Sequence, residues 1–191
     1  MAKTNSGKAW VTWADTHAPN SDRVDDLSEP FRAHAKAFLA ALKAAGATAK
    51  VSATVRHVKR AYLFHWCWLI GLGKEKASAA KPLVGVDVEW DHGDAAKSKA
   101  GALEMIRGFK LAVPPDSLVA PALASNHIAG KAIDVHIAWT GELTVAKKDG
   151  TVVKVPYMVN PNSNVKLHAV GASYGLKKHL HDKPHWSVDG H

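Results

Sequence analysis

Changes in the hydrophobic period divide this chain into predicted helices and strands. After Ser28, apolar residues recur three and four positions apart as far as Leu42, and Gly46 follows as a typical helix stop. We therefore predict an amphipathic core helix there, with the Ser28 hydroxyl as its cap and Pro30 in its first turn. Similar spacing predicts three further helices, at Val58–Leu72, Ala95–Gly108 and Asn164–Ala172.

Alternating apolar and polar residues, many of them β-branched, predict strands between these helices. One predicted strand, Lys50–Arg56, delivers Arg56 at its end, and another covers Ala132–Ile137. Shorter extended segments are predicted at Val84–Glu89 and Lys183–Val188.

The segments Glu142–Val145 and Thr151–Val155 flank an Asp149-Gly150 pair, which predicts a hairpin with a tight turn because Asp-Gly accepts positive φ angles. The predicted helices and strands do not alternate regularly along the chain. We therefore expect an α+β fold with an antiparallel sheet and flanking helices.

The chain length and the apolar content fit one globular domain, with 191 residues of which 47% are hydrophobic. We expect a partly irregular segment over residues 1–26, anchored by Trp10 and Trp13, and a single domain over residues 27–191. The longest apolar run, Ala61–Gly73, contains His65 and is shorter than the roughly 20 residues that cross a bilayer, so it predicts a buried helix rather than a transmembrane segment. The polar N-terminal residues lack the features of a secretory signal.

The single cysteine, Cys67, excludes an internal disulfide framework, and its apolar neighbours predict a buried, unreactive thiol. The net charge of +8 favours polyanionic partners, namely nucleic acid, anionic lipid or bacterial cell wall. The lysines are scattered, and the sequence holds no basic recognition helix, glycine-rich phosphate loop or paired-cysteine zinc module. We therefore expect no specific nucleic-acid partner.

Two histidines and two carboxylates near the end of the chain provide the donors of a catalytic zinc site, which needs three protein ligands and a general base. His127 and Asp134 lie seven residues apart, with Gly130-Lys131 midway. A tight turn there would oppose them across two strands, and a looser loop entering the Ala132–Ile137 strand would also bring them together. His136 shares a strand face with Asp134 and is therefore a competing ligand.

The motif around these residues resembles the signature of the zinc D-Ala-D-Ala carboxypeptidase and dipeptidase family. That family includes the vancomycin-resistance peptidases and the L-alanyl-D-glutamate peptidases of phage endolysins. The resemblance covers about residues 120–191 and is carried by Ser125-x-His127-x-x-Gly130-x-Ala132-x-Asp134 and by Asp182-x-x-His185. It implies the hedgehog/DD-peptidase fold, with zinc held by His127, Asp134 and His185.

The resemblance also implies catalytic roles for a carboxylate and an arginine. Asp182 stands where family members carry Glu or Asp, and as general base it would take a proton from water activated by zinc. Arg56 is the candidate for stabilising the oxyanion. Its context, Thr54-Val55-Arg56-His57, departs from the Gly-Tyr-Arg-Ser usual in the family, so Arg60 is kept as the alternative.

Further residues near the motif are candidates for binding substrate. Ser125 is expected to hydrogen-bond substrate or to orient the site, and Tyr174 and Trp186 to form a wall for the peptide, although each has an equally good structural interpretation. A separate acidic segment contains Asp91, His92 and Asp94. Its position after a predicted strand favours turn formation over metal binding.

From these features we expect a zinc peptidase that hydrolyses the peptide stems of bacterial peptidoglycan, as a carboxypeptidase or an endopeptidase. Without a signal peptide it would be made in the cytoplasm and act at the cell wall after lysis or specialised secretion. That location suits a lysin or an antibacterial effector with a delivery or immunity partner. The alternative is a non-catalytic binding module that keeps the zinc for stability, as in hedgehog-type relatives of the fold.

Overall fold

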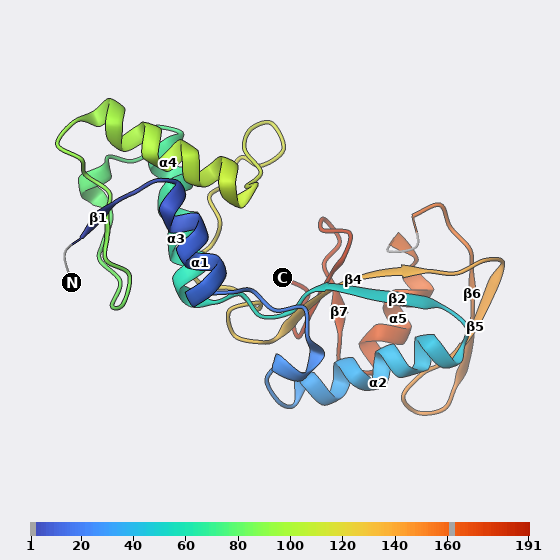
Figure 1. Cartoon of the computed structure of the whole chain (residues 1–191). Helices are drawn as coiled ribbons and strands as arrows, with labels where there is room; N and C mark the ends of the chain where they lie inside the picture. Colours follow the sequence, from blue (N-terminus) through green and yellow to red (C-terminus); the bar gives the residue numbers. More distant parts are fainter. Residues whose placement is uncertain (1–2, 161–162) are drawn as a thin grey trace. The chain divides into compact units, whose positions relative to one another are not determined.

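A computed structural model describes residues 3–160 and 163–191, which divide into two compact units (Figure 1). Unit 1 contains the described residues up to Asn20 together with His57–Ala124, and unit 2 contains Ser21–Arg56 together with Ser125–His191. Each unit is therefore assembled from two separate stretches of chain. This division differs from the predicted boundary at residue 26, because the partners of each segment lie far away in the sequence.

Unit 1 is mainly helical (Figure 1). Its helices are α1 (Lys8–His17), α3 (Val58–Gly71) and α4 (Ala95–Phe109), and α4 packs against both of the others. Two short parallel strands, β1 (Thr4–Asn5) and β3 (Val88–Glu89), and the 3₁₀ turn η2 (Ala77–Ala79) complete it. The core joins side chains from all three helices and from the β3 region, among them Trp10, Leu63, Trp90 and Met105.

Helix α1 lies in the segment that was predicted to be partly irregular. Its buried residues, Trp10 and Ala14, are four positions apart and so face the same side of the helix. The short element carries too weak a periodic signal by itself, and its packing against α4 stabilises it. Cys67 in α3 is fully buried, as predicted, and burial raises the pKa of its thiol.

Unit 2 is built on a four-stranded antiparallel sheet in the order β2-β4-β8-β7. The strands are β2 (Thr48–Ala53), β4 (Ala132–Ala138), β7 (Lys177–Lys178) and β8 (His185–Ser187). Two helices, α2 (Phe31–Ala44) and α5 (Val165–Ser173), share its core, and β5 (Glu142–Ala146) pairs with β6 (Val152–Pro156) in a separate hairpin. The 3₁₀ turn η1 (Val24–Asp26) precedes α2. The predicted α+β class and antiparallel sheet are confirmed.

Alternation along β4 separates the core of unit 2 from its polar face. Ile133, Val135 and Ile137 are buried in the cluster that also contains side chains of α2 and α5. Successive side chains of a strand point to opposite faces, so Asp134 and His136 lie on the face away from these helices. This alternation leaves one side of the sheet for polar chemistry.

One helix start differs from the sequence prediction. The Ser28 hydroxyl does not cap α2, because Pro30 occupies the N-cap position. Ser28 instead donates to the carbonyl oxygen of Ala129 at 3.0 Å, and Glu29 accepts from the Ala33 amide near the start of the helix.

The predicted hairpin around Asp149-Gly150 is confirmed. The β5–β6 connection is a five-residue loop, closed by the hydrogen bond from the Lys147 amide to the Thr151 carbonyl. Gly150 has the positive φ, +86°, that the sequence predicted.

None of the helices within the described residues combines the length and the apolar character that crossing a bilayer requires. Most of the predicted apolar run lies in α3, which is 14 residues long and ends at Gly71.

Candidate metal centre

Three side chains of unit 2 converge on one small volume. His127 Nε2, His185 Nδ1 and Asp134 Oδ1 form a nearly equilateral triangle: the two nitrogens are 3.1 Å apart, and they lie 3.2 and 3.1 Å from the carboxylate oxygen. Each histidine is only 7% exposed, and the Asp134 side chain is 22% exposed. The three residues are close enough to bind a metal ion together.

The sheet register brings two of these residues together. Asp134 in β4 is the direct antiparallel partner of His185 in β8, so both side chains leave the same face of the sheet. On the other side of β4, the β2 pairing shifts by one residue between Val51 and Ala53. Such bulges redirect the strand that contains them, and this one lies directly before Thr54, which contacts the site.

His127 enters from a compact turn rather than from a strand. The turn is closed by hydrogen bonds from the Lys131 amide to the Asn126 carbonyl and from the Gly130 amide to the His127 carbonyl. Gly130 ends it with φ +68°, and a Cβ there would lie 2.6 Å from the Ser28 hydroxyl. The tight-hairpin hypothesis is therefore wrong, and the looser loop entering β4 is correct.

Backbone carbonyls fix the tautomer of both imidazoles. His127 Nδ1 lies 2.6 Å from the Thr54 carbonyl oxygen, and His185 Nε2 lies 3.1 Å from the backbone oxygen of His191. A carbonyl oxygen only accepts hydrogen bonds, so we assign the N–H to each of these ring nitrogens. In the neutral imidazoles, the opposite nitrogens then point their lone pairs at the Asp134 carboxylate. Three acceptor atoms then face one another, and a proton or a metal ion held between them relieves their repulsion.

The charge of Asp134 matches this arrangement. Burial would raise the pKa of its carboxyl, but the hydrogen bonds to His127 and His185 outweigh burial and hold the pKa far below its usual range. For His185, burial lowers the pKa of the imidazole, and the Asp134 carboxylate more than reverses this, so the net shift is upward. The site is therefore organised around an ionised carboxylate that attracts positive charge.

Arg56 lies at the edge of the same site. Its backbone amide donates to the His127 carbonyl at 3.2 Å. Burial lowers the pKa of its guanidinium, and the negative charge of Asp134 opposes that shift, which places the two charges within electrostatic range. Arg60 belongs to unit 1, where its guanidinium donates to the Ala18 carbonyl and pairs with Asp15. Of the two predicted arginines, Arg56 is therefore the one associated with the histidine–carboxylate cluster.

Asp182 lies in the loop between β7 and β8. Its carbonyl accepts from the His185 amide at 3.2 Å, which forms the turn that the sequence predicted between these two residues. Its negative charge acts on His185 and on the neighbouring His179, and its side chain is exposed. Asp182 is thus not one of the three converging residues, but it lies close enough to raise the pKa of His185.

The predicted substrate-binding residues have other roles in the structure. The Ser125 hydroxyl accepts from the Ile128 amide at 3.3 Å and so supports the turn that carries His127. Trp186 is fully buried with its ring 5.2 Å from that of Phe38, and Tyr174 is 8% exposed and donates to the Ala146 carbonyl. The prediction that the two aromatic residues form a substrate wall is therefore wrong.

The position of Trp186 has a local reason. It follows His185 in β8, so its side chain points to the opposite face, into the core. Gly171 of α5 packs against it, since a Cβ at Gly171 would lie 2.4 Å from the indole ring. The competing ligand His136 is exposed and lies opposite Lys50 in the β2–β4 pairing.

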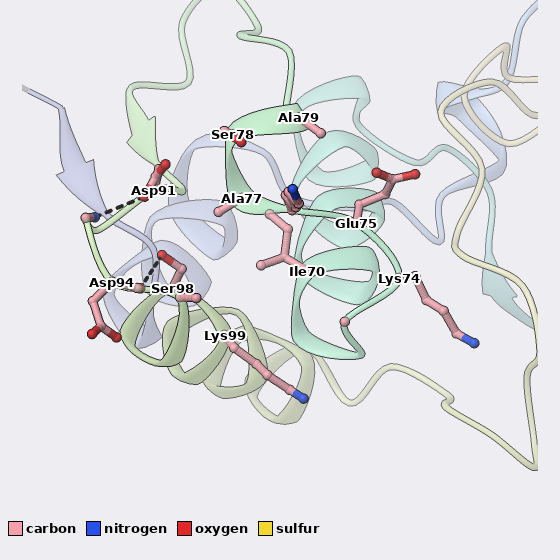
Figure 2. Close-up of a pocket in the computed structure, with 14 residues that line it drawn as sticks. Ile70, Lys74, Glu75, Ala77, Ser78, Ala79, Asp91, Asp94, Ser98 and Lys99 are labelled. Atoms are coloured by element: carbon pink, nitrogen blue, oxygen red, sulfur yellow. Dashed lines mark hydrogen bonds between the residues drawn. The ribbon is translucent and has the colours of Figure 1, made fainter.

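The polar segment at residues 91–98 of unit 1 serves turn structure, as predicted. Asp94 caps α4 by accepting from the Lys97 amide at 2.8 Å, and Asp91 accepts from the Gly93 amide at 3.0 Å. The Ser98 hydroxyl accepts from the His92 amide and donates to the Asp94 carbonyl. Asp91, Asp94 and Ser98 line a groove of about 950 Å³, which Lys74 and Glu75 line from a separate segment (Figure 2).

Several groups around the site were missed at the level of sequence. The Thr54 and His191 carbonyls that fix the imidazoles are backbone atoms and carry no residue-type signal. Lys178 and His179 were also missed. The His179 ring lies 5.7 Å from that of His185, and Lys178 is buried beside the loop between β7 and β8. A lysine predicts an exposed position by default, so its burial could not be anticipated.

Comparisons with family models, with curated proteins and with solved structures found no match to this chain.

Proposed function

We propose that unit 2 binds zinc through His127, Asp134 and His185. The observation that carries this proposal is the convergence of three acceptor atoms, with both imidazole N–H groups turned outward to carbonyls. Such outward hydrogen bonds are typical of histidines that bind metals. The arrangement offers two imidazole nitrogens and one carboxylate oxygen to a metal ion, which would replace the proton that His185 shares with Asp134.

The dimensions and the donor types favour zinc over other common ions. A tetrahedral ion with bonds of about 2.0 Å has ligand atoms about 3.3 Å apart, close to the 3.1–3.2 Å separations found here. Calcium prefers six to eight oxygen ligands at longer distances, and magnesium keeps an octahedral shell of oxygens. Two imidazoles and one carboxylate form the ligand set of catalytic zinc sites that keep a fourth position open.

We further propose that the site hydrolyses a peptide bond. Zinc supplies Lewis acidity there, toward a carbonyl group and toward water. Asp182 accepts a proton from the attacking water and later delivers a proton to the leaving amine. Arg56, held beside His127 by its backbone, donates to the carbonyl oxygen as negative charge develops on it. The electrostatic interactions of Arg56 with Asp134 and of Asp182 with His185 support these roles.

The substrate class in this proposal is the peptide stem of peptidoglycan, cut as a carboxypeptidase or an endopeptidase. It is supported by the resemblance of the Ser125–Asp134 and Asp182–His185 motifs to the zinc D-Ala-D-Ala peptidase family and its hedgehog/DD-peptidase fold. The basic net charge of +8 suits an anionic cell wall. A role as a lysin or a secreted antibacterial effector follows from the same substrate.

The test is digestion of purified peptidoglycan by the full chain. Zinc-loaded protein is expected to release fragments whose masses identify the bond cut, and a chelator is expected to abolish release until zinc is returned. The matched control is His185→Ala, which removes one ligand. Unchanged fragment profiles with zinc-loaded protein, together with tight zinc binding, would instead favour the non-catalytic zinc module.

A further inference from the structure

Lys178 is an ammonium group enclosed by backbone carbonyls. It ends β7 and is 8% exposed. Its Nζ donates to the carbonyl oxygens of His179 at 2.6 Å, Asp182 at 2.5 Å and His185 at 3.0 Å. A lysine ammonium has three donors, so all three are used.

Such burial has to be compensated by these contacts. Removing an ammonium from water is costly unless it is hydrogen-bonded, and three carbonyl dipoles directed at it provide that compensation. The Nζ also lies 5.7 Å from the centre of the Trp186 ring, whose π face attracts a cation. The contacts therefore bind the side chain firmly in one place.

Two of the three carbonyls belong to His179 and Asp182 in the loop between β7 and β8, and the third belongs to His185, the first residue of β8. This loop carries Asp182 and leads into His185, and Pro184 prevents Lys183 from adopting helical geometry. The loop is also held by backbone hydrogen bonds from the His179 amide to the His185 carbonyl and from the Val135 amide to the Pro184 carbonyl. The three bonds to Lys178 add a single anchor inside the loop, which joins its first residue to Asp182 and to His185. Without the Lys178 ammonium, the side chains of Asp182 and His185 would be held less closely in their present positions.

We propose that Lys178 is a positioning residue, whose ammonium holds the 179–185 loop so that His185 and Asp182 both serve the metal site. The part that concerns Asp182 rests on the proposed peptidase function. The part that concerns His185 rests on metal binding alone. Lys178 itself touches neither metal nor substrate in this proposal.

The experiment replaces Lys178 in the full chain and measures zinc affinity by competition with a chromophoric chelator. Lys178→Met keeps the length of the side chain and removes its three donors. It is expected to weaken zinc binding about 10- to 100-fold, the range typical of residues that orient metal ligands. The matched control is Lys177→Met, because Lys177 is the exposed neighbour in β7, and wild-type zinc affinity is expected for it.

A merely structural role would lower the melting temperature and leave zinc affinity unchanged in protein that is still folded. A folded Lys178→Met variant with wild-type affinity would therefore overturn the proposal. If this variant does not fold, Lys178→Gln replaces it, because its amide can reach at most two of the three carbonyls. If that variant also fails, ¹⁵N NMR of the wild type decides: Lys178 ammonium protons that exchange as fast as those of Lys177 would contradict the proposed enclosure.

Peptidoglycan hydrolysis separates this proposal from the proposed function. If the wild type is active, Lys178→Met saturated with zinc is expected to show a lower kcat with little change in KM, because Asp182 is displaced. If zinc-saturated wild type releases nothing while Lys178→Met still weakens zinc binding, the peptidase function fails and the positioning of His185 stands.

Discussion

Two clusters of polar residues, one in each unit, have similar compositions and opposite structural roles. In unit 1, Asp91, His92 and Asp94 are adjacent in sequence, and hydrogen bonds within residues 91–98 satisfy both carboxylates and the His92 amide. In unit 2, His127 and His185 are 58 residues apart and meet at Asp134 with their acceptor atoms facing one another. The adjacent residues form a turn, and the distant ones form a candidate metal site.

The difference shows what distinguishes a functional cluster from turn chemistry. Local polar residues find donors in the nearest backbone amides, so their lone pairs are used as soon as the turn forms. At the unit 2 cluster the backbone instead takes the imidazole N–H groups, which leaves lone pairs directed at a shared point. Donor atoms held together in this way inside a protein form a candidate metal site.

Removing a ligand should give the largest difference between the two clusters. His185→Ala is expected to weaken zinc binding by more than about 100-fold, beyond the effect of losing an outer partner. His92→Ala, the corresponding change in unit 1, should leave the zinc affinity unchanged. Zinc content after dialysis, measured by mass spectrometry, checks both. Equal loss of zinc in the two variants would contradict the assignment of the site.

Removing the proposed base should separate catalysis from metal binding. Asp182→Ala is expected to lower peptidoglycan hydrolysis by about 10²- to 10⁴-fold, because no carboxylate then accepts the proton from water. Zinc should stay bound, because Asp182 is not one of the three converging ligands. The exposed Asp149 in the β5–β6 loop offers a control, and Asp149→Ala should keep full activity. Full activity in Asp182→Ala would remove the proposed base from the mechanism.

Acid should weaken the unit 2 cluster. Because the pKa of His185 is raised by Asp134, the metal-free imidazole keeps its proton to higher pH than an ordinary histidine, and that proton competes with zinc. Zinc affinity is expected to fall by more than about tenfold between about pH 7.5 and 5.5. Calorimetric titration at several pH values measures this. A flat profile would show that His185 does not exchange a proton for the metal.

The pKa shifts of His185 and Asp134 also make the stability of the metal-free protein depend on pH. The raised pKa of His185 contributes stability that is present below the unfolded pKa and lost as pH rises through the folded one. The lowered pKa of Asp134 contributes stability above its unfolded pKa that is lost only in strong acid. Added zinc should therefore raise the melting temperature more at pH 8 than at pH 5.5, and thermal scans in both buffers check the sign.

The turn that presents His127 should tolerate little change at Gly130. Gly130→Ala is expected to destabilise unit 2 by about 1–2 kcal/mol from its positive φ alone, and further because the new Cβ would meet Ser28. Gly46→Ala is the matched control, since its φ is +86° and its Cβ would meet nothing within 4 Å. Urea denaturation gives the free energy of unfolding of both variants, and the difference between them isolates the contribution of the Ser28 contact. Equal losses of unfolding free energy would show that this contact contributes nothing.

The smallest expected effect lies in the unit 1 cluster. Asp94→Ala removes the cap of α4 and is expected to cost about 1 kcal/mol, whereas Asp94→Asn should cost almost nothing because Asn caps equally well. Neither change should alter the zinc affinity. Denaturation with and without zinc measures the free energy of unfolding and the stabilisation by zinc. If Asp94→Ala changed the stabilisation by zinc, the unit 1 cluster would also be involved in metal binding.

Local patterns predicted much of the secondary structure. The apolar spacing after Ser28 and the run at Val58–Leu72 predicted α2 and α3 nearly to the residue. These helices bury apolar residues that recur at helical spacing in the sequence. Helix α1 and the two-unit organisation were not predicted. Their stability comes from partners far along the chain, which a local window does not contain.

The sequence by itself determined the candidate donor types, since the spacing of His127 and Asp134 indicated a possible metal site and the motif resemblance added His185 before any fold was known. Only the tertiary structure decided how they meet: the β4–β8 register sets Asp134 opposite His185, and a turn ending at Gly130 supplies His127. It also decided that Trp186 faces the core and that Lys178 is buried among carbonyls. Residue type fixes which atoms can bind, whereas backbone pairing and burial fix where their lone pairs point.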